Sequence, residues 1–371
     1  MKIIILKSNL LEGLNSVEKS VSNNQNFPIL RNIKIEVNKE DSNIKITSTD
    51  LEIAITRTIT GKIISEGNVL VPFFVLNRII KNLNSEKINL EVKNNKLLIN
   101  SDNYEGSINC EKIEDYPIIP EIQNNKEYLK LKNSDLIESL SETLIATNYS
   151  DIRPEINGVY IKYDGKDLFM AGTDGFRLVE KVLQERYINS NFKEIETVIP
   201  LKTIENIIRT LDEDDEIEIL IDDNQVLFKN KKIKIISRLV DGKFPDYKAV
   251  IPTEKNTEIT INKNELESAI KITSSFSGKA NDISLKIMDK GKILEISSSE
   301  STLGENRYRA PIKTKGDKKD IELIFNWKYL KDGLSIFKNE EVVLGINEPT
   351  KAMSINSDNN NLIYVVMPIR G

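Results

Sequence analysis

One stretch in the middle of the chain decides the fold: VIPLKTIENIIRTL, residues 198–211. It opens with a short apolar run that ends at Pro200, which predicts a strand. Its second part carries apolar residues at Ile204, Ile207, Ile208 and Leu211. Residues spaced i, i+3, i+4 and i+7 share one face of a helix. The stretch therefore predicts a strand that runs directly into a helix with one buried face.

The same strand–helix pattern occurs once before and once after this stretch. The earlier copy has a strand at 69–72 and a helical stripe at Leu76, Ile79, Ile80 and Leu83. The later copy has a strand at 323–326 and a stripe at Leu330, Leu334 and Phe337. Pro72, Pro200 and Asn326 lie 128 and 126 residues apart, and so long a fixed period indicates a repeated unit of domain size. In a chain of 371 residues this spacing predicts three domains.

Each repeat contains further elements in the same order. An amphipathic helix comes first, with its apolar residues at Leu10, Leu11, Leu14, Val17 and Val21, at Leu136, Ile137, Leu140 and Leu144, and at Leu266, Ala269, Ile270 and Thr273. We expect the helix N-caps at Ser8, Ser134 and Asn264. A strand with alternating apolar residues follows, at 33–37, 159–161 and 283–287. A hairpin closes each repeat, at 88–99, 217–228 and 342–355.

The ends of the first two repeats mark the domain boundaries. Both end in a proline motif, DYP at 115–117 and KFP at 243–245. We therefore predict domains at 1–125, 126–252 and 253–371, each an α+β unit of two helices packed on antiparallel sheets. If the sheets run continuously between neighbouring domains, the outermost edge strands stay free, and closing a ring is one way to pair them.

The composition excludes several classes of chemistry. The chain has no histidine, which removes Ser-His and Cys-His catalysis and histidine metal sites. It has no phosphate-binding loop of the form G-x-x-x-x-G-K-[ST], and we expect neither a cofactor nor a metal. A single cysteine, Cys110, with no signal peptide and no apolar run near 20 residues, predicts a cytoplasmic protein that does not enter a membrane. The net charge of −5 argues against a broadly basic DNA-binding surface.

Five motifs, in this order, resemble one family, the bacterial DNA polymerase III beta subunit or sliding clamp. They are FPILRN at 27–32, RPEINGV at 153–159, TDGFRL at 173–178, RLVDGKFPDY at 238–247 and YVVMPIR at 364–370. The resemblance spans the whole chain. It implies a head-to-tail homodimer, a ring of six similar domains whose helices line a channel around duplex DNA.

Encirclement fits an acidic chain, because a ring keeps DNA without tight phosphate binding and its channel needs only some positive charge. The candidate channel residues are Lys81, Arg153, Lys202 and Arg209. The alternative is that these are ordinary solvated side chains.

The resemblance also implies a groove between the second and third domains that accepts short linear peptides. The peptides belong to the replicative DNA polymerase, the ATP-driven clamp loader, and other polymerases and repair proteins. The matching positions are Ile156, Thr173, Gly175, Phe176, Arg177, Leu178, Pro245, Val250, Asn326, Tyr329, Val365, Val366, Met367, Pro368, Ile369 and Arg370. The apolar members would form the floor, with Met367 adapting to varied ligands, and the two arginines would donate hydrogen bonds to the peptide.

Some of these positions have simpler interpretations. Residues 365–369 read equally well as the last core strand, and Asp174 as a turn residue that binds its own backbone. Two positions depart from the family: Phe176 stands where histidine is common, and Ala249 where arginine is common. Both changes make the groove more apolar.

At the ring joint the family often sets basic residues of the first domain against acidic residues of the third. Here the first-domain edge strand, 104–108, carries Glu105 and Ile108. The third domain offers Ile272, Glu300, Glu305 and Arg307. We expect the charge pairing to be partly reversed, with Glu105 opposite an arginine and Ile108 against Ile272.

The sequence therefore favours a non-catalytic processivity factor of DNA replication. Two alternatives stay open. One is a clamp-like, peptide-binding scaffold without ring closure. The other is an enzyme, a hydrolase using Asp174 with Glu155 or Asp246.

Overall fold

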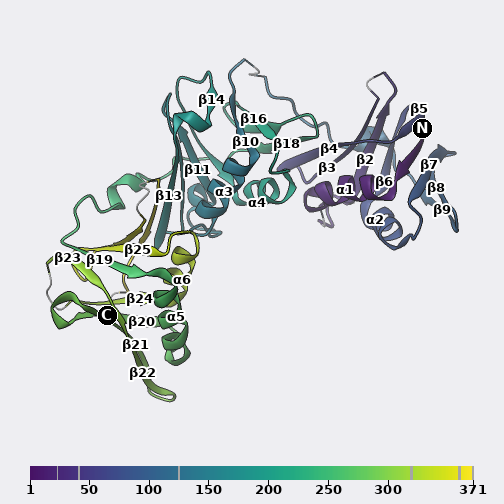
Figure 1. Ribbon diagram of the computed structural model, residues 1–371. Helices are drawn as coiled ribbons and strands as arrows, with labels where there is room; N and C mark the ends of the chain where they lie inside the picture. The colour runs from purple at the N-terminus through teal and green to yellow at the C-terminus, as the bar shows by residue number, and fades with distance from the viewer. Residues whose placement is uncertain (23, 41, 124–125, 318–320, 358–360, 370–371) are drawn as a thin grey trace. The chain divides into compact units, whose positions relative to one another are not determined.

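The computed structural model describes residues 1–22, 24–40, 42–123, 126–317, 321–357 and 361–369 (Figure 1). These residues form two compact units, which are described separately. Unit 1 consists of Met1–Ile137, Asn189–Phe192 and Glu205–Leu239, and unit 2 of Glu138–Ile188, Lys193–Ile204 and Val240–Gly371. The division falls within α3 (Asn133–Leu144) and α4 (Leu201–Thr210).

Unit 1 contains a nine-stranded and a five-stranded antiparallel sheet. The nine-stranded sheet has the order β14 (Asn189–Ser190), β10 (Leu129–Lys132), β16 (Glu216–Ile221), β17 (Gln225–Lys229), β18 (Ile233–Arg238), β4 (Ile53–Ile59), β3 (Asn43–Thr49), β2 (Asn32–Asn38) and β6 (Gly67–Pro72). The five-stranded sheet has the order β5 (Lys62–Ser65), β1 (Lys2–Leu6), β7 (Lys87–Lys93), β8 (Lys96–Ser101) and β9 (Tyr104–Asn109).

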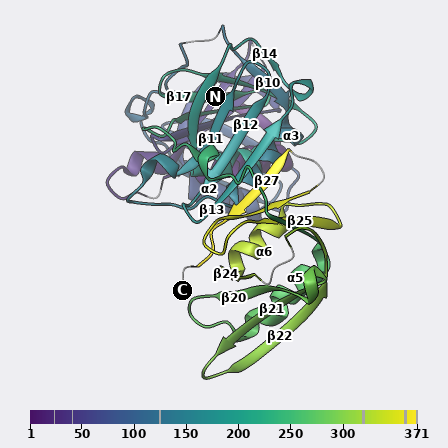
Figure 2. The same cartoon turned by 90° about the vertical axis from the view of Figure 1, so that its left-hand side faces the viewer.

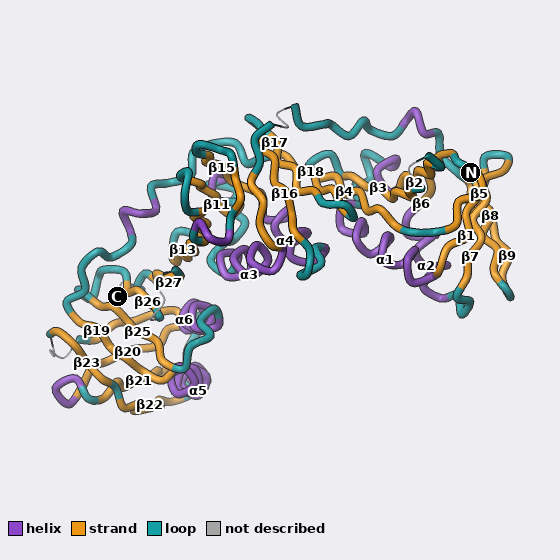
Figure 3. The backbone as a smooth tube through the Cα atoms, turned by 45° about the horizontal axis from the view of Figure 1, so that its top comes forward, coloured by secondary structure: helices purple, strands orange, loops and turns teal. Residues whose placement is uncertain are grey.

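Two helices cover one side of these strands. They are α1 (Lys7–Val17) and α2 (Phe73–Asn82), which lie together beside β2, β3 and β4 in Figure 3. Their buried residues include Leu10 and Leu14 on α1 and Leu76 and Ile80 on α2, four of the positions that the helical period predicts. Hydrophobic burial of this face holds the helices on the sheets.

Unit 2 has the same construction. Its nine-stranded sheet has the order β15 (Ile195–Pro200), β11 (Gly158–Tyr163), β12 (Leu168–Thr173), β13 (Arg177–Leu183), β27 (Leu362–Val366), β26 (Met353–Asn356), β25 (Glu341–Ile346), β19 (Thr257–Asn262) and β23 (Lys313–Gly316). Its four-stranded sheet has the order β22 (Gly304–Pro311), β21 (Ile293–Glu300), β20 (Asp282–Met288) and β24 (Glu322–Asn326). The helices are α5 (Lys263–Thr273) and α6 (Trp327–Ser335).

The sheets run continuously from one sequence repeat to the next, as predicted. In unit 1, β18 of the second repeat pairs with β4 of the first, with Ser237 opposite Ile53. In unit 2, β27 of the third repeat pairs with β13 of the second, with Val366 opposite Arg177. Figure 2 shows β27 in yellow beside β13. β9 lies at one edge of the five-stranded sheet, and β22 lies at one edge of the four-stranded sheet.

Two sequence predictions about the start of each repeat are wrong. A strand, not a helix, opens each repeat (β1, β10 and β19), and each runs straight into the first helix. The helices consequently begin before the expected caps, which fall in their first turns. In α5 the cap is Asn262, whose side chain accepts a hydrogen bond from the Glu265 N–H at 3.1 Å.

The prediction that one face of each alternating strand is wet fails for β11. Tyr160, on the face expected to be solvated, is buried, because Phe244 stacks on it with a ring-centroid distance of 4.9 Å. The segment after β18 therefore closes over the outer face of this sheet.

Candidate functional site

The described residues of the predicted groove all lie in unit 2. Most of them lie on or next to three features: the turn between β12 and β13, the segment 244–251, and β27 with the C-terminal tail that follows it. Ile156 precedes β11, Asn326 ends β24 and Tyr329 lies on α6. Arg370 lies outside the described residues.

The turn between β12 and β13 is fixed by its own polar side chains. The Thr173 hydroxyl donates to the Arg177 carbonyl at 2.7 Å and accepts from the Gly175 N–H at 3.0 Å. Asp174 Oδ1 accepts from the backbone N–H groups of Phe176 and Arg177 at 2.9 and 3.0 Å. Gly175 has φ +89°, a conformation that side-chain-bearing residues rarely adopt. The interpretation of Asp174 as a turn residue is confirmed.

Arg177 is held by carboxylates of its own chain. Its guanidinium donates to Asp174 at 3.0 Å and to Asp332 at 2.6 Å, and its carbon lies 4.5 Å from the ring centroid of Tyr329. Burial opposes the charge, yet Asp332 and then Asp174 raise the pKa of Arg177 above its ordinary value. Two of its donors therefore tie the turn to α6, and its donation to a peptide stays a prediction.

The C-terminal tail continues past β27 along the same turn. The Met367 N–H donates to the Phe176 carbonyl at 2.8 Å, and the Ile369 N–H donates to the Ile324 carbonyl at 2.7 Å. Val365 and Val366 are buried strand residues, as the simpler interpretation of this segment held. Met367 is half-buried and packs against the same cluster as Val365. The tail therefore contributes Met367 and Ile369 to the surface.

The segment 244–251 is fastened over the sheet by groups that the sequence did not indicate. The Tyr247 hydroxyl donates to Glu180 at 2.6 Å, and Lys248 forms an ion pair with the same carboxylate. Lys248 also lies 4.7 Å from the ring centroid of Phe169. Burial, and then the bond to Glu180, raise the pKa of Tyr247. Glu180 and Tyr247 are 67 residues apart, so no local pattern could have paired them.

The groove residues divide into a buried base and an exposed surface. Ile156 and Leu178 are buried in a cluster with Phe244 and Val365. Pro368 is also buried, whereas Pro245, Asn326 and Tyr329 are half-buried.

The exposed surface is apolar. The side chains of Phe176, Val250 and Ile369 are 62%, 52% and 37% exposed. Apolar side chains left exposed around fixed backbone are typical of a contact surface for another molecule. The hydrogen bond from the Met367 N–H to the Phe176 carbonyl joins the turn to the tail, so this surface is continuous between them.

Among the predicted channel residues, Arg153 borders the turn of the groove. Its guanidinium donates to Glu155 at 3.2 Å, and a Cβ placed on Gly175 would lie 3.5 Å from its Nη1 atom. Its place in the channel stays a prediction. Lys81 on α2, and Lys202 and Arg209 on α4, are exposed residues of helices.

Four of the predicted joint residues lie on edge strands, Glu105 and Ile108 on β9 in unit 1 and Glu305 and Arg307 on β22 in unit 2, whereas Ile272 lies on α5. Glu105 on β9 is exposed. Arg307 on β22 pairs with Glu305 of its own strand at 3.3 Å, and Glu300 ends β21. Ile272 is 52% exposed, but Ile108 is only 6% exposed. Ile108 thus belongs to the core of its own sheet and has little surface to offer Ile272.

The described residues contain no group of three or more acidic or cysteine side chains arranged to hold a metal ion. None of the helices among them is long and apolar enough to cross a membrane.

Comparison with known proteins gives one consistent result. Family models of the DNA polymerase III beta subunit match the N-terminal domain at residues 1–120, the central domain at 130–246 and the C-terminal domain at 248–370. The beta sliding clamp of Bacillus subtilis is 27% identical, with 100% of both chains covered. That of Rickettsia felis is 26% identical, also with 100% of both chains covered.

Solved structures agree with the sequence relatives. The crystal structure of the Bacillus subtilis DNA polymerase sliding clamp is similar with a TM-score of 0.92 at 26% identity, covering 100% of this chain and 99% of that one. A sliding clamp from Pseudomonas aeruginosa bound to griselimycin is similar with a TM-score of 0.93 at 26% identity, covering 100% of both chains.

Proposed function

The chain belongs to the family of the DNA polymerase III beta subunit, the bacterial sliding clamps, and from this premise we propose how it works as a processivity factor. Its three repeated clamp domains perform no catalysis. Two chains associate head to tail, the ring encircles duplex DNA, and the replicative polymerase is tethered to it. The predicted boundaries near residues 125 and 252 are part of this proposal.

The tether is the apolar surface of unit 2. The observation that carries this proposal is an apolar surface of exposed Phe176 and Ile369 with half-buried Met367, on a turn and tail whose backbones are hydrogen-bonded to each other. A fixed apolar surface binds a short peptide without first having to order itself. Phe176 and Ala249, where family members often have polar residues, favour peptides rich in apolar side chains.

Other parts of the proposal rest on family membership. The clamp loader and repair proteins use the same surface in turn, the loader opens the ring with ATP, and the protein works in the cytoplasm. Lys81, Arg153, Lys202 and Arg209 face DNA. The hydrolase interpretation has little support, because Asp174 is occupied with backbone N–H groups and Arg177.

The peptide surface is tested by fluorescence anisotropy with a labelled peptide from the C-terminus of the cell's replicative polymerase. Met367→Ala removes an adaptable side chain from the surface and should weaken binding about tenfold, a loss of about 1.4 kcal/mol. The control is Met288→Ala, the same substitution at a half-buried position on β20. Equal affinity of both variants for the peptide would contradict the groove, and so would loss of binding that only accompanies loss of the dimer.

The scaffold without ring closure remains the second candidate. One observation favours it: Arg307, an arginine of the predicted joint, is already paired with Glu305 of its own chain. Exposed pairs contribute only about 0–1 kcal/mol, so this does not decide against a dimer. The molecular mass in solution separates the two candidates.

A further inference from the structure

Unit 1 contains a second copy of the turn that forms the groove in unit 2. The Thr49 hydroxyl donates to the Ile53 carbonyl at 2.9 Å and accepts from the Leu51 N–H at 3.1 Å. Asp50 Oδ1 accepts from the N–H groups of Glu52 and Ile53 at 3.0 and 2.9 Å. Leu51 has φ +79°, close to the +89° of Gly175. The four hydrogen bonds that Thr173 and Asp174 Oδ1 make with the backbone of the turn at 173–177 thus have their counterparts here.

The surroundings of the turn are repeated as well. The Arg238 N–H donates to the Glu52 carbonyl at 3.0 Å, just as the Met367 N–H donates to Phe176. A buried aromatic ring followed by a proline lies beside each turn, Tyr116-Pro117 here and Phe244-Pro245 in unit 2. Unit 1 therefore repeats the turn, the backbone bond and the aromatic–proline pair that surround the groove of unit 2.

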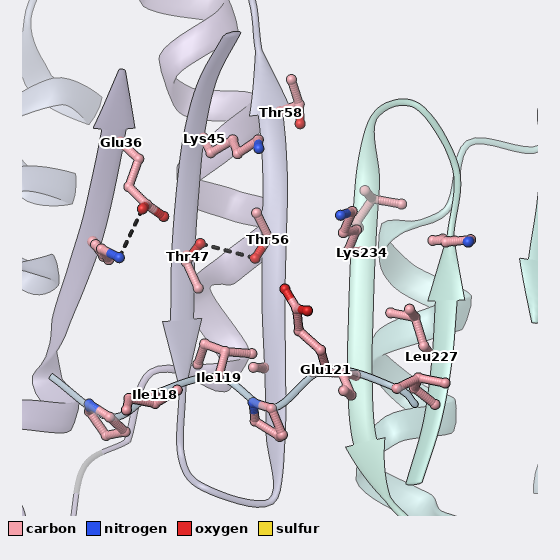
Figure 4. A pocket seen from close by; sticks show the side chains of 18 of the residues that line it. Glu36, Lys45, Thr47, Thr56, Thr58, Ile118, Ile119, Glu121, Leu227 and Lys234 are labelled. Carbon is pink, nitrogen blue, oxygen red and sulfur yellow. Dashed lines mark hydrogen bonds and ion pairs between the residues drawn. The ribbon is translucent and has the colours of Figure 1, made fainter. Parts of the chain in front are cut away.

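In unit 1 this framework encloses a cavity. The linker 113–122 crosses the outer face of the sheet and leaves about 1050 Å³ beneath it, with a further 340 Å³ toward the turn (Figure 4). The two spaces share Ala54, Ile119 and Ile236 in their walls. Together they exceed the usual volume of a small-molecule pocket, and their open sides admit an extended chain.

The charges of the cavity favour an acidic occupant. Five lysines line it, and two of them are paired, Lys34 with Glu36 and Lys229 with Glu218. The other three, Lys45, Lys231 and Lys234, make no ion pair within the described part of the chain. Three carboxylates also line it, Glu36, which pairs with Lys34, and Glu114 and Glu121 of the linker.

The rim of the cavity is apolar. Ile118 is 95% exposed on the linker, and Leu51 is 43% exposed on the turn. In Figure 4, Ile118, Ile119 and Glu121 lie along the linker, and Lys45 and Lys234 on the strands beside it. The cavity can therefore offer an apolar contact at its rim and, next to it, lysine side chains that can bind carboxylates.

We propose that unit 1 carries a second peptide-binding groove, bounded by the turn 49–53, the linker 113–122 and the strands β4 and β18. Its ligand is an extended acidic peptide with an apolar anchor side chain. The anchor contacts Ile118 and Leu51, and the peptide carboxylates accept hydrogen bonds from Lys45, Lys231 and Lys234. Glu121 opposes the binding of these carboxylates. The proposal rests on the cavity of unit 1 and does not require the groove of unit 2.

The test uses the full chain carrying Met367→Ala, so that the groove of unit 2 contributes little. The probe is a fluorescein-labelled hexapeptide of two leucines flanked on each side by two aspartates, followed by anisotropy. A probe with lysines in place of the aspartates measures non-specific binding. We expect only the acidic probe to bind.

Two substitutions should then move the dissociation constant in opposite directions. Lys45→Glu with Lys234→Glu should raise it about tenfold or more, and Glu121→Gln should lower it. The matched control is Lys166→Glu with Lys193→Glu, exposed positions of unit 2, with no effect expected. The proposal is overturned if the acidic probe fails to bind the Met367→Ala chain, or if its binding does not respond to the reversal at Lys45 and Lys234. If only the unit 2 groove is wrong, Met367→Ala will leave the affinity for the polymerase peptide unchanged, while the acidic probe still binds unit 1.

Discussion

At the scale of single residues, the backbone conformation at position 175 is the most demanding feature of the site. Gly175 has φ +89°, and its backbone N–H is fixed by Thr173. The sequence motif pointed to this residue only through a family resemblance, and the turn chemistry of Asp174 explains it physically. By contrast, no sequence pattern could indicate Asp332, which meets Arg177 from 155 residues away.

Gly175→Ala should lower the free energy of unfolding by about 1 kcal/mol, because alanine adopts this φ only at a cost. Space is not the obstacle, since the nearest atom to a new Cβ would be Arg153 Nη1 at 3.5 Å. Urea unfolding measures the effect. The matched comparison is Leu51→Gly against Leu51→Ala in the equivalent turn, where glycine should be the more stable by a similar amount. An unchanged stability in both turns would refute the conformational argument.

Arg57 is the most deeply buried charge among the described residues of unit 1. It lies on β4 at 2% exposure and pairs with Glu12 of α1 and with Asp212 at 3.2 Å, while its Nε atom has no partner. The two carboxylates are half exposed, so water can solvate them if the arginine is lost. The cost of its removal is therefore mainly one of packing and of lost hydrogen bonds.

Arg57→Ala should destabilise unit 1 by about 1–3 kcal/mol, and Arg57→Met, which keeps most of the volume, by less. Hydrogen exchange of β4 amides measures the local effect. Equal losses for both variants would show that charge, not packing, dominates.

The same cluster predicts a dependence on pH. Burial opposes the charge on Asp212, yet Arg57 and then Lys232 lower its pKa below the ordinary value. A carboxyl with a lowered folded pKa stabilises the fold above its unfolded pKa and loses that contribution as pH falls through the folded value. Stability of unit 1 should therefore decline below about pH 4, and Arg57→Met should flatten this decline. A decline of unchanged slope in Arg57→Met would exclude the cluster as its source.

At the scale of elements, periodicity predicted the helices well and the short strands poorly. The stripes of α2, α4 and α6 are long enough for a 3.6-residue period to stand out, and their residues are buried as expected except Ile79 and Ile208, which are half-buried. The opening strand β10 has only Leu129 and Leu131 to mark it, which is too little for any pattern. Its pairing with β16 decides its conformation, and pairing between distant segments is not visible in local sequence.

Elements far apart in the chain also decide the outer face of unit 2. The alternation in β11 predicted one wet face, but Phe244 and Tyr247 cover Tyr160. We predicted a domain junction at the proline motif 243–245. Phe244 of this motif, together with Tyr247, also covers the outer face of β11. In unit 1, Tyr116, which corresponds to Phe244, instead lines the cavity beneath the linker.

At the scale of the whole molecule, the period of 126–128 residues predicted three repeated units, and the three matching domain models confirm them. Continuous sheets between repeats leave β9 and β22 as edge strands. Unpaired edges of this kind are commonly covered by another chain. The composition could not predict which side chains meet at the joint, and Ile108, which we expected to contact Ile272, is buried in its own sheet.

The mass in solution, measured by light scattering across a dilution series, tests the central claim most directly. A ring of two chains predicts a species near twice the chain mass of 42.3 kDa that persists on dilution. A monomer at every concentration would contradict the ring and leave the peptide-binding scaffold, and a trimer would contradict the head-to-tail dimer.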